Sequence, residues 1–392
     1  MRLLFGVVLL DLIGFGIVIP ILPFLSPQLG ADKLDIAFII VGYAVFSALF
    51  GPLWGRLSDR IGRKPVIMIC LAGASLSYVM LGLASELWMV YAARAFGGMM
   101  AGNFGVASAM MADITGPENR AKGMGLIGAA FGMGLVIGPL LGGVLSGPEA
   151  SFTMPCIVAG MMSVLAIIAA ALFLPESLTP EKRAAHKQAA HAGESMYAML
   201  KRTGNRLFVS QYVLHNAGVS AVTYIMPLWF GDLLGWTARE VGILFGVQGA
   251  IMAVVQGGLM GMLVRAFGEW PLLRSCIAFY FGGLLLAAFA NETWVMIASA
   301  FIGMTGATMC MPLLNTLITQ RTPAPQRGQT MGTTGAASSV GRVVGPLLGG
   351  WVLYTQGYTA AWIAFAIIVF FYLLWALVES RRVAASATVT GD

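Results

Sequence analysis

Three charged side chains stand inside long apolar stretches of the sequence, where a charge is costly unless it has a partner or a function. Asp11 lies in the first such stretch, Arg94 in the fourth and Arg342 in the eleventh. An apolar environment disfavours the ionised form of a carboxylate, so Asp11 is suited to taking up and releasing a proton. We expect Arg94 to pair with Asp11, so that proton binding weakens the contact and releases a helix. The alternatives are a neutral, hydrogen-bonded carboxyl group and a structural ion pair.

The apolar stretches define the class of protein. Of the 392 residues, 58% are hydrophobic and 10% are charged, and the mean hydropathy is +0.83. A soluble chain carries roughly 25% charged residues, so the soluble enzyme classes are excluded. About 20 apolar residues cross a bilayer as a helix, which predicts an all-α integral membrane protein with twelve transmembrane helices. The predicted spans are residues 3–25, 36–55, 65–84, 88–110, 123–145, 152–174, 207–230, 240–263, 271–289, 294–314, 329–353 and 357–378.

The positive charges predict how the chain is oriented. If the N-terminus is cytoplasmic, 19 of the 23 Lys and Arg lie on the cytoplasmic side, while only Lys33 and Arg239 face outward. Such asymmetry in short loops orients inner-membrane proteins, so we predict a multi-pass protein of the bacterial inner membrane with both termini in the cytoplasm. The net charge of +6 is spread over these loops, so we expect no nucleic-acid partner.

An internal repeat runs through most of the chain at an offset of 206 or 207 residues. RAKGMGLIGAAFGMGLVIGPLLGG at residues 120–143 matches RGQTMGTTGAASSVGRVVGPLLGG at 327–350. The repeat predicts two pseudo-symmetric six-helix halves, which suggest an alternating-access carrier that rocks around a central site. A channel or a membrane enzyme could also arise by duplication. The predicted parts are an N-terminal half at 1–174, a cytoplasmic central loop at 175–205, a C-terminal half at 206–380 and a cytoplasmic tail at 381–392.

The loop after the second span combines cations, a carboxylate and glycines in a pattern that favours a gate. Gly55 allows close helix approach, and Asp59 among four cations can bind arginines or a helix N-terminus and so latch the cytoplasmic face shut. A positively charged membrane anchor is the alternative, but it explains neither the Asp nor the glycines. In the second half Arg265 replaces the Asp, so a latch there would be degenerate. The predicted gate residues are Gly55, Asp59, Arg60, Gly62, Arg63 and Lys64.

The fifth span carries glycines four residues apart on one helix face. Small residues at this spacing let two helices touch backbone to backbone, which by itself is general membrane packing. Pro139 also removes a backbone donor from the span. The pattern consists of Gly134, Gly138, Pro139, Gly142 and Gly143, and it recurs at residues 341–350.

Polar side chains in the other spans are candidates for a substrate cavity. An amide within a span either lines a cavity or holds helices together. A lone histidine such as His215 either titrates near neutral pH or is a hydrogen-bonded lining residue. Arg342 either answers a negative charge on a substrate or caps backbone carbonyls. The candidate cavity residues are Asn103, His215, Asn216, Gln248, Gln256, Tyr280, Asn315 and Arg342.

These motifs resemble those of a known transporter family over essentially the whole chain. The loop from Gly55 to Lys64 is similar to the loop signature of the major facilitator superfamily. The fifth-span pattern resembles the antiporter motif of its drug/proton exchangers, and the surroundings of Asp11 and Arg94 resemble their first and fourth spans. Asp113 and Arg120, in the loop between the fourth and fifth spans, form a further pair familiar from the family, although such exposed pairs are usually weak.

Within that superfamily the sequence resembles bacterial tetracycline/proton antiporters in particular, which implies export of a metal-chelated drug in exchange for a proton. Two positions depart from those pumps, because Ser77 and Tyr280 stand where they carry aspartates in the third and ninth spans. A cationic metal chelate would meet fewer counter-charges here. Tetracycline and a different amphipathic drug or metabolite therefore both remain candidate substrates.

The sequence thus predicts a proton-coupled drug antiporter that exports a small amphipathic molecule and functions as a monomer. No cofactor is expected, because the proton gradient supplies the driving force, although the substrate could arrive as a metal chelate. The four cysteines lie in spans at no metal-ligand spacing, so no metal site is expected either. A proton-coupled uptake symporter is the nearest alternative. A membrane enzyme or a receptor is least favoured, since the spans contain no cluster of His, Asp, Glu and Cys.

Overall fold

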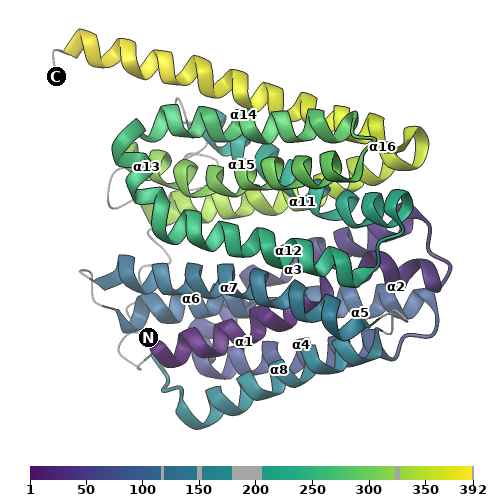
Figure 1. Ribbon diagram of the computed structural model, residues 1–392. Coiled ribbons are helices and arrows are strands. Elements are labelled where there is room, and N and C mark those ends of the chain that lie inside the picture. The colour runs from purple at the N-terminus through teal and green to yellow at the C-terminus, as the bar shows by residue number, and fades with distance from the viewer. Residues whose placement is uncertain (116–118, 148–151, 179–204, 323–326, 391–392) are drawn as a thin grey trace. The chain divides into compact units, whose positions relative to one another are not determined.

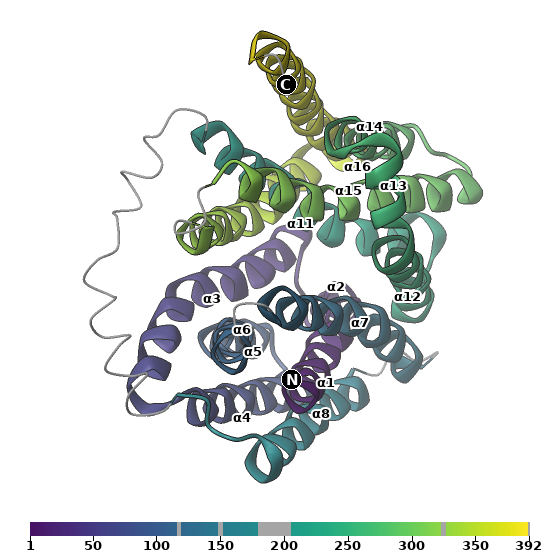
Figure 2. The same ribbon diagram turned by 90° about the vertical axis from the view of Figure 1, so that its left-hand side faces the viewer.

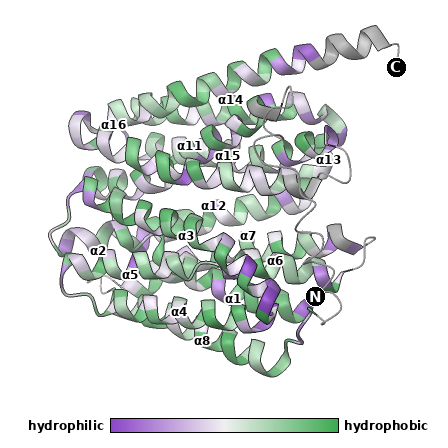
Figure 3. Cartoon of the chain, turned by 180° about the vertical axis from the view of Figure 1, so that it is seen from behind, coloured by the Kyte–Doolittle hydropathy of each residue, from purple (hydrophilic) through white to green (hydrophobic). Residues whose placement is uncertain are grey.

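The computed structural model of the chain describes residues 1–115, 119–147, 152–178, 205–322 and 327–390, and every element of regular structure among them is a helix (Figure 1). Helices satisfy their backbone polar groups within one segment, which is what a bilayer demands of apolar stretches. Hydrophobic residues run along most of the helices (Figure 3), and large apolar side chains such as Leu172 and Trp294 are 70% and 71% exposed. A surface this apolar is suited to lipid.

The first of two compact units comprises Met1–Glu194 and Phe230–Ala250. Within it, α1 packs against α7 and α8, and α4 packs against α8. The two short helices α5 and α6 are enclosed by α1, α3, α4 and α7, as Figure 2 shows in a view nearly along them. The helices up to the central loop are α1 (Arg2–Val18), α2 (Leu22–Gln28), α3 (Lys33–Ile61), α4 (Arg63–Gly82), α5 (Leu87–Met99), α6 (Asn103–Ile114), α7 (Arg120–Ser146) and α8 (Thr153–Phe173).

The glycines of the fifth span form the contact between α1 and α7. A Cβ atom at Gly134 would lie 2.5 Å from the Cβ of Leu12, and one at Gly138 would lie 2.5 Å from the Cα of Gly16. Such distances are too short for real Cβ atoms, so only glycine allows the two backbones to approach this closely. The helix that carries Asp11 is therefore held directly against α7.

The second compact unit comprises Ser195–Trp229 and Ile251–Asp392. Helix α14 packs against α15, with Gly283 set against the Ser299 carbonyl, and against α16. Large aromatic side chains fill this unit, and the rings of Trp229 and Trp362 lie 5.1 Å apart. The helices after the central loop are α11 (Asn205–Leu234), α12 (Ala238–Val254), the π-helix η2 (Val255–Leu259), α13 (Met260–Phe267), α14 (Glu269–Ala288), α15 (Thr293–Gln320) and α16 (Arg327–Thr390).

Nine helices in the described part of the chain are long and apolar enough to cross a membrane, or ten if the bent pair of α1 and α2 counts as one span. The predicted count of twelve spans differs from the count of ten at two places. The predicted span 88–110 is interrupted after Met99 and forms α5 and α6, each shorter than a span. The two last predicted spans lie together in α16, on either side of Gly357, whose φ of 82° breaks the helix. The number twelve thus stays a prediction.

Candidate transport and gating sites

Asp11 lies on α1 in a small pocket of the first unit and is 8% exposed. Its Oδ2 accepts a hydrogen bond from Nδ2 of Asn103, the first residue of α6. The rest of the pocket is apolar and is lined by Val7, Val8, Ile67, Leu71, Phe104 and Ala107. A carboxylate in such surroundings has little to stabilise its charge beyond one amide, which is the setting in which a proton is readily held.

Arg94 does not pair with Asp11 in this structure. Its guanidinium carbon lies 4.2 Å from the centre of the Tyr43 ring, a cation–π contact, and the side chain is buried. Within the described part of the chain its Nε atom finds no hydrogen-bond acceptor. The sequence indicated that both charges are buried, but it could not show that a ring and an amide would take the places of their expected partners.

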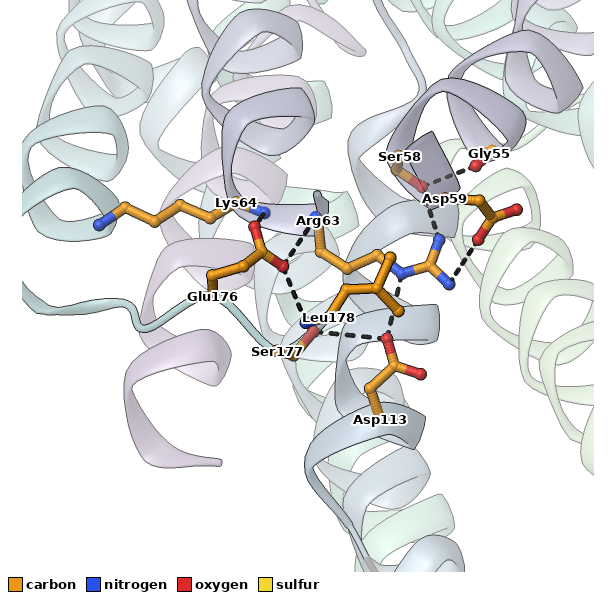
Figure 4. A network of polar contacts seen from close by, with 9 residues as sticks. All are labelled: Gly55, Ser58, Asp59, Arg63, Lys64, Asp113, Glu176, Ser177 and Leu178. Carbon is orange, nitrogen blue, oxygen red and sulfur yellow. Dashed lines mark hydrogen bonds and ion pairs between the residues drawn. The ribbon is translucent and has the colours of Figure 1, made fainter. Parts of the chain in front are cut away.

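Arg63 is the centre of the loop motif (Figure 4). Its side chain is 5% exposed and bridges two carboxylates, with Nη2 2.8 Å from Oδ1 of Asp59 and Nε 3.1 Å from Oδ2 of Asp113. Its Nη1 also donates to Oγ of Ser58 at 2.6 Å. Gly62, which has a φ of 114°, both ends α3 and begins α4, so a glycine is needed for the turn that places Arg63. The arrangement ties the end of α3 to α4 and α6.

Glu176 completes this network, and the sequence did not assign it a role there. Its Oε1 accepts from the backbone N–H of Arg63 at 2.9 Å, and its Oε2 from that of Lys64 at 3.0 Å (Figure 4). These are the first amides of α4, which have no intrahelical partner, and a negative charge at a helix N-terminus is favourable. The internal repeat is the sequence signal that could have pointed to Glu176, because Glu176-Ser177 follows the sixth span as Glu379-Ser380 follows the last.

The other residues predicted for the gate and the loop pair are Gly55, Arg60, Lys64 and Arg120. Lys64 extends along α8, where its Nζ donates to the Ala171 carbonyl at 2.8 Å, and Arg60 is exposed. Within the first unit no atom lies within 4 Å of a Cβ atom placed at Gly55, so the close helix approach expected there is not made inside this unit. The side chain of Arg120 lies outside the described residues, so its predicted pairing with Asp113 stays a prediction.

The candidate cavity residues of the second half are spread over several contacts. Nδ2 of Asn216 donates to the Tyr212 carbonyl at 2.9 Å and to Ser338 Oγ at 3.1 Å, and Tyr212 OH donates to Asn315 Oδ1 at 2.8 Å. Likewise, Nε2 of Gln256 donates to the carbonyl of Thr308 at 2.9 Å. These amides hold helices together, which is the second of the two roles considered for them.

The expectation that Arg342 is a buried cation is wrong. Its side chain is exposed, and its Nη2 donates to Ser339 Oγ at 2.9 Å.

His215 is buried between two tyrosine rings, and its ring centre lies 6.4 Å from that of Tyr280 and 6.0 Å from that of Tyr372. Tyr280 also lines a small apolar pocket of the second unit with Trp229 and Trp362, two residues that the sequence did not single out. Gln248 is buried as well.

Comparisons with known proteins identify the family to which this helical membrane protein belongs. The model of the Major Facilitator Superfamily matches residues 4–343 and, in a second match, 259–391. The chain belongs to this superfamily. It is therefore a multi-pass membrane transporter and not an enzyme.

Curated relatives extend over nearly the whole chain. The class H tetracycline resistance protein of Pasteurella multocida is 27% identical over 98% of this chain and 97% of its own. The class C tetracycline resistance protein of Escherichia coli is 30% identical over 88% and 87%. Multidrug resistance protein 2 of Bacillus subtilis is 27% identical over 86% and 84%. This superfamily member thus has drug resistance proteins among its homologues.

A solved structure shows the same fold. The crystal structure of a bacterial homologue of the human lysosomal transporter Spinster matches with a TM-score of 0.79, covering 97% of this chain and 96% of that one at 14% identity. The match supports the two-half fold of the superfamily.

Proposed function

We propose that this transporter exports an amphipathic drug in exchange for protons, by alternating access between its two halves. The observation that carries the proposal is Asp11, a carboxylate in an apolar pocket of a predicted span with a single amide partner. Neutralising it with a proton removes a buried charge, so the protonated and ionised forms stabilise different packings of α1. A proton gradient can then drive the cycle, and no cofactor is required.

Arg94 contributes to proton coupling as a second buried charge in the same unit. Among the described residues it faces a tyrosine ring and forms no ion pair with a carboxylate. A buried cation in the same bundle as Asp11 is costly unless it has a function, which favours a role for Arg94 in proton coupling.

The loop network around Arg63 acts as the cytoplasmic gate, with both termini of the chain in the cytoplasm. It joins the ends of α3, α4 and α6 through charge-assisted hydrogen bonds, which are stronger than neutral ones. Such a network can hold one arrangement of the helix ends until the opposite half moves.

The substrate proposed is an amphipathic drug, with tetracycline as the first candidate and no requirement for a metal chelate. Tetracycline and multidrug resistance proteins both stand among the relatives. Ser77 and Tyr280 provide neutral groups, and the Ser77 hydroxyl is already used by the Ala93 carbonyl at 2.8 Å. A cationic chelate would find no carboxylate at either position, whereas a neutral or weakly charged drug needs none.

The test is drug/proton exchange by purified protein in liposomes, with tetracycline, a fluoroquinolone and ethidium as probes. Asp11→Asn preserves shape but cannot ionise, so we expect inserted, folded protein in which exchange driven by a pH gradient falls at least tenfold. Glu292→Gln is the matched carboxylate-to-amide control at an exposed helix start, where the side chain makes no capping bond. Wild-type rates for Asp11→Asn would refute the role of Asp11. Wild-type protein that exchanges none of the probes for protons would refute the proposed function.

A further inference from the structure

The interruption between α5 and α6 is built into the first unit by specific contacts. The indole Nε1 of Trp54 donates to the carbonyl of Met99 at 2.6 Å, so it satisfies an acceptor that the end of α5 leaves without a helical partner. Gly102 then lies against the same side chain, and a Cβ atom there would be 2.5 Å from Cβ, Cγ and Cδ1 of Trp54. Trp54 thus fixes both sides of the break.

Asn103 is the first residue after the break, and both ends of its amide are engaged. Its Oδ1 accepts from the backbone N–H of Phe104 at 3.0 Å, at the start of α6. This leaves Nδ2 as the end that faces α1, where it donates to Oδ2 of Asp11. The side chain of Asn103 therefore links the carboxylate on α1 to the place where the fourth span is interrupted.

The other groups near Asp11 do not supply such a link. Cys70 and Tyr78 of α4 interact with it electrostatically, and both are buried and uncharged in their ordinary forms. Arg94 of α5 and Cys156 of α8 interact with Tyr78, one step further away. The α7 side of α1 is the glycine contact described above. Among the described residues, the hydrogen bond from Asn103 is the one side-chain hydrogen bond to Asp11.

We propose that Asn103 is a positioning residue for the proton of Asp11, and that through it the protonation of α1 is transmitted to the break in the fourth span. The inference rests on the proposed proton-driven export. The N–H of Asn103 donates best to an ionised carboxylate. When a proton occupies Oδ2, that oxygen becomes a donor, the bond is lost and the start of α6 is released from α1. Asn103 thereby acts through Asp11 rather than on the drug.

The test compares the pH dependence of drug/proton exchange in liposomes for wild type and Asn103→Leu, which keeps the side-chain size but has no donor. Loss of a bond that favours the ionised form moves the pH midpoint of exchange upward by about one unit. The KM for tetracycline stays within about twofold of the wild-type value if the residue does not contact the drug. Asn103→Ser, which retains a donor and a helix-capping hydroxyl, returns the midpoint towards wild type and covers the case in which the leucine variant fails to fold.

Asn216→Leu is the matched control, because it removes an amide in the second half whose hydrogen bonds go to a backbone carbonyl and a serine hydroxyl rather than to a carboxylate. Its pH midpoint is expected to equal that of wild type, whatever its KM. An unshifted midpoint in Asn103→Leu, a midpoint raised by about one unit in Asn103→Ser, or a change confined to the KM for tetracycline would overturn the inference and leave the proposed function intact. A wild-type protein without proton-driven exchange would instead remove the proposed function, and the inference with it.

Discussion

In the first half Arg63 is held by two carboxylates, whereas the equivalent residue of the second half, Glu269, accepts one hydrogen bond from Gln320 at 3.0 Å. The repeat places Glu269 at the position of Arg63, and Gln320 at that of Asp113. The same two helices are therefore joined at the same point in both halves. In the first half the joint is ionic and buried, while in the second it is neutral at one end and exposed.

In the second half the cation near this joint is Arg321, one residue after Gln320. Its Nη1 lies 2.7 Å from Oε1 of Glu379, and its guanidinium covers the rings of Phe208 and Trp270 at 4.7 and 5.5 Å. Glu379 is the repeat partner of Glu176, which binds the first amides of α4 instead. Both halves keep the glutamate after the sixth span, but one half uses it to cap a helix and the other to hold an arginine on aromatic rings.

A second contrast lies within the spans. The position equivalent to Asp11 is Gly218, and a side chain there would collide with the hydroxyl of Tyr280. The second half thus fills with an uncharged phenol the place where the first half keeps a carboxylate. The ionisable groups proposed for proton coupling and gating thus lie in the first half.

The largest difference in stability between the two halves is expected for Arg63→Gln. Removing the buried cation takes from Asp113 its ion pair with Arg63, and breaking such a pair costs about 3–5 kcal/mol. Glu269→Gln at the equivalent site should cost less than about 1 kcal/mol, because its bond is exposed and a glutamine can replace it. Thermal unfolding in detergent measures both. Equal losses in the two variants would show that the halves do not differ in this respect.

An intermediate effect is expected from Glu176→Ala. It removes the acceptor for two orphan amides of α4 and should cost about 1 kcal/mol, as the loss of a helix cap does. Glu379→Ala should cost less, because Arg321 keeps its contacts with Phe208 and Trp270. Unfolding temperatures of the two variants give the order. A larger loss in Glu379→Ala would mean that the ion pair, rather than the aromatic rings, secures Arg321.

The sequence was sufficient for features that depend on composition and spacing. Apolar length predicted the helices, and the four-residue glycine spacing predicted a close helix contact, which Gly138 makes with α1. It was insufficient where a side chain had to choose among partners far along the chain. Nothing local says that Asp11 takes Asn103 rather than Arg94, or that Glu176 reaches the start of α4. The break after Met99 also depends on Trp54, which is 45 residues away in sequence.

The smallest effect on stability, and the sharpest test of the gate, is expected from Asp59→Asn. Asp59 is 45% exposed, so its ion pair with Arg63 should contribute no more than about 1 kcal/mol to folding. Arg63 would still be held by Asp113 and Ser58, and the network would persist with one ionic bond fewer. If that bond belongs to the gate, exchange in liposomes should fall severalfold while the unfolding temperature barely changes.

Arg265→Gln, the same position in the second half, is the control and should leave the exchange rate near wild type. Full exchange by Asp59→Asn would favour the membrane-anchor interpretation of the loop, because an anchor needs its cations and not the carboxylate.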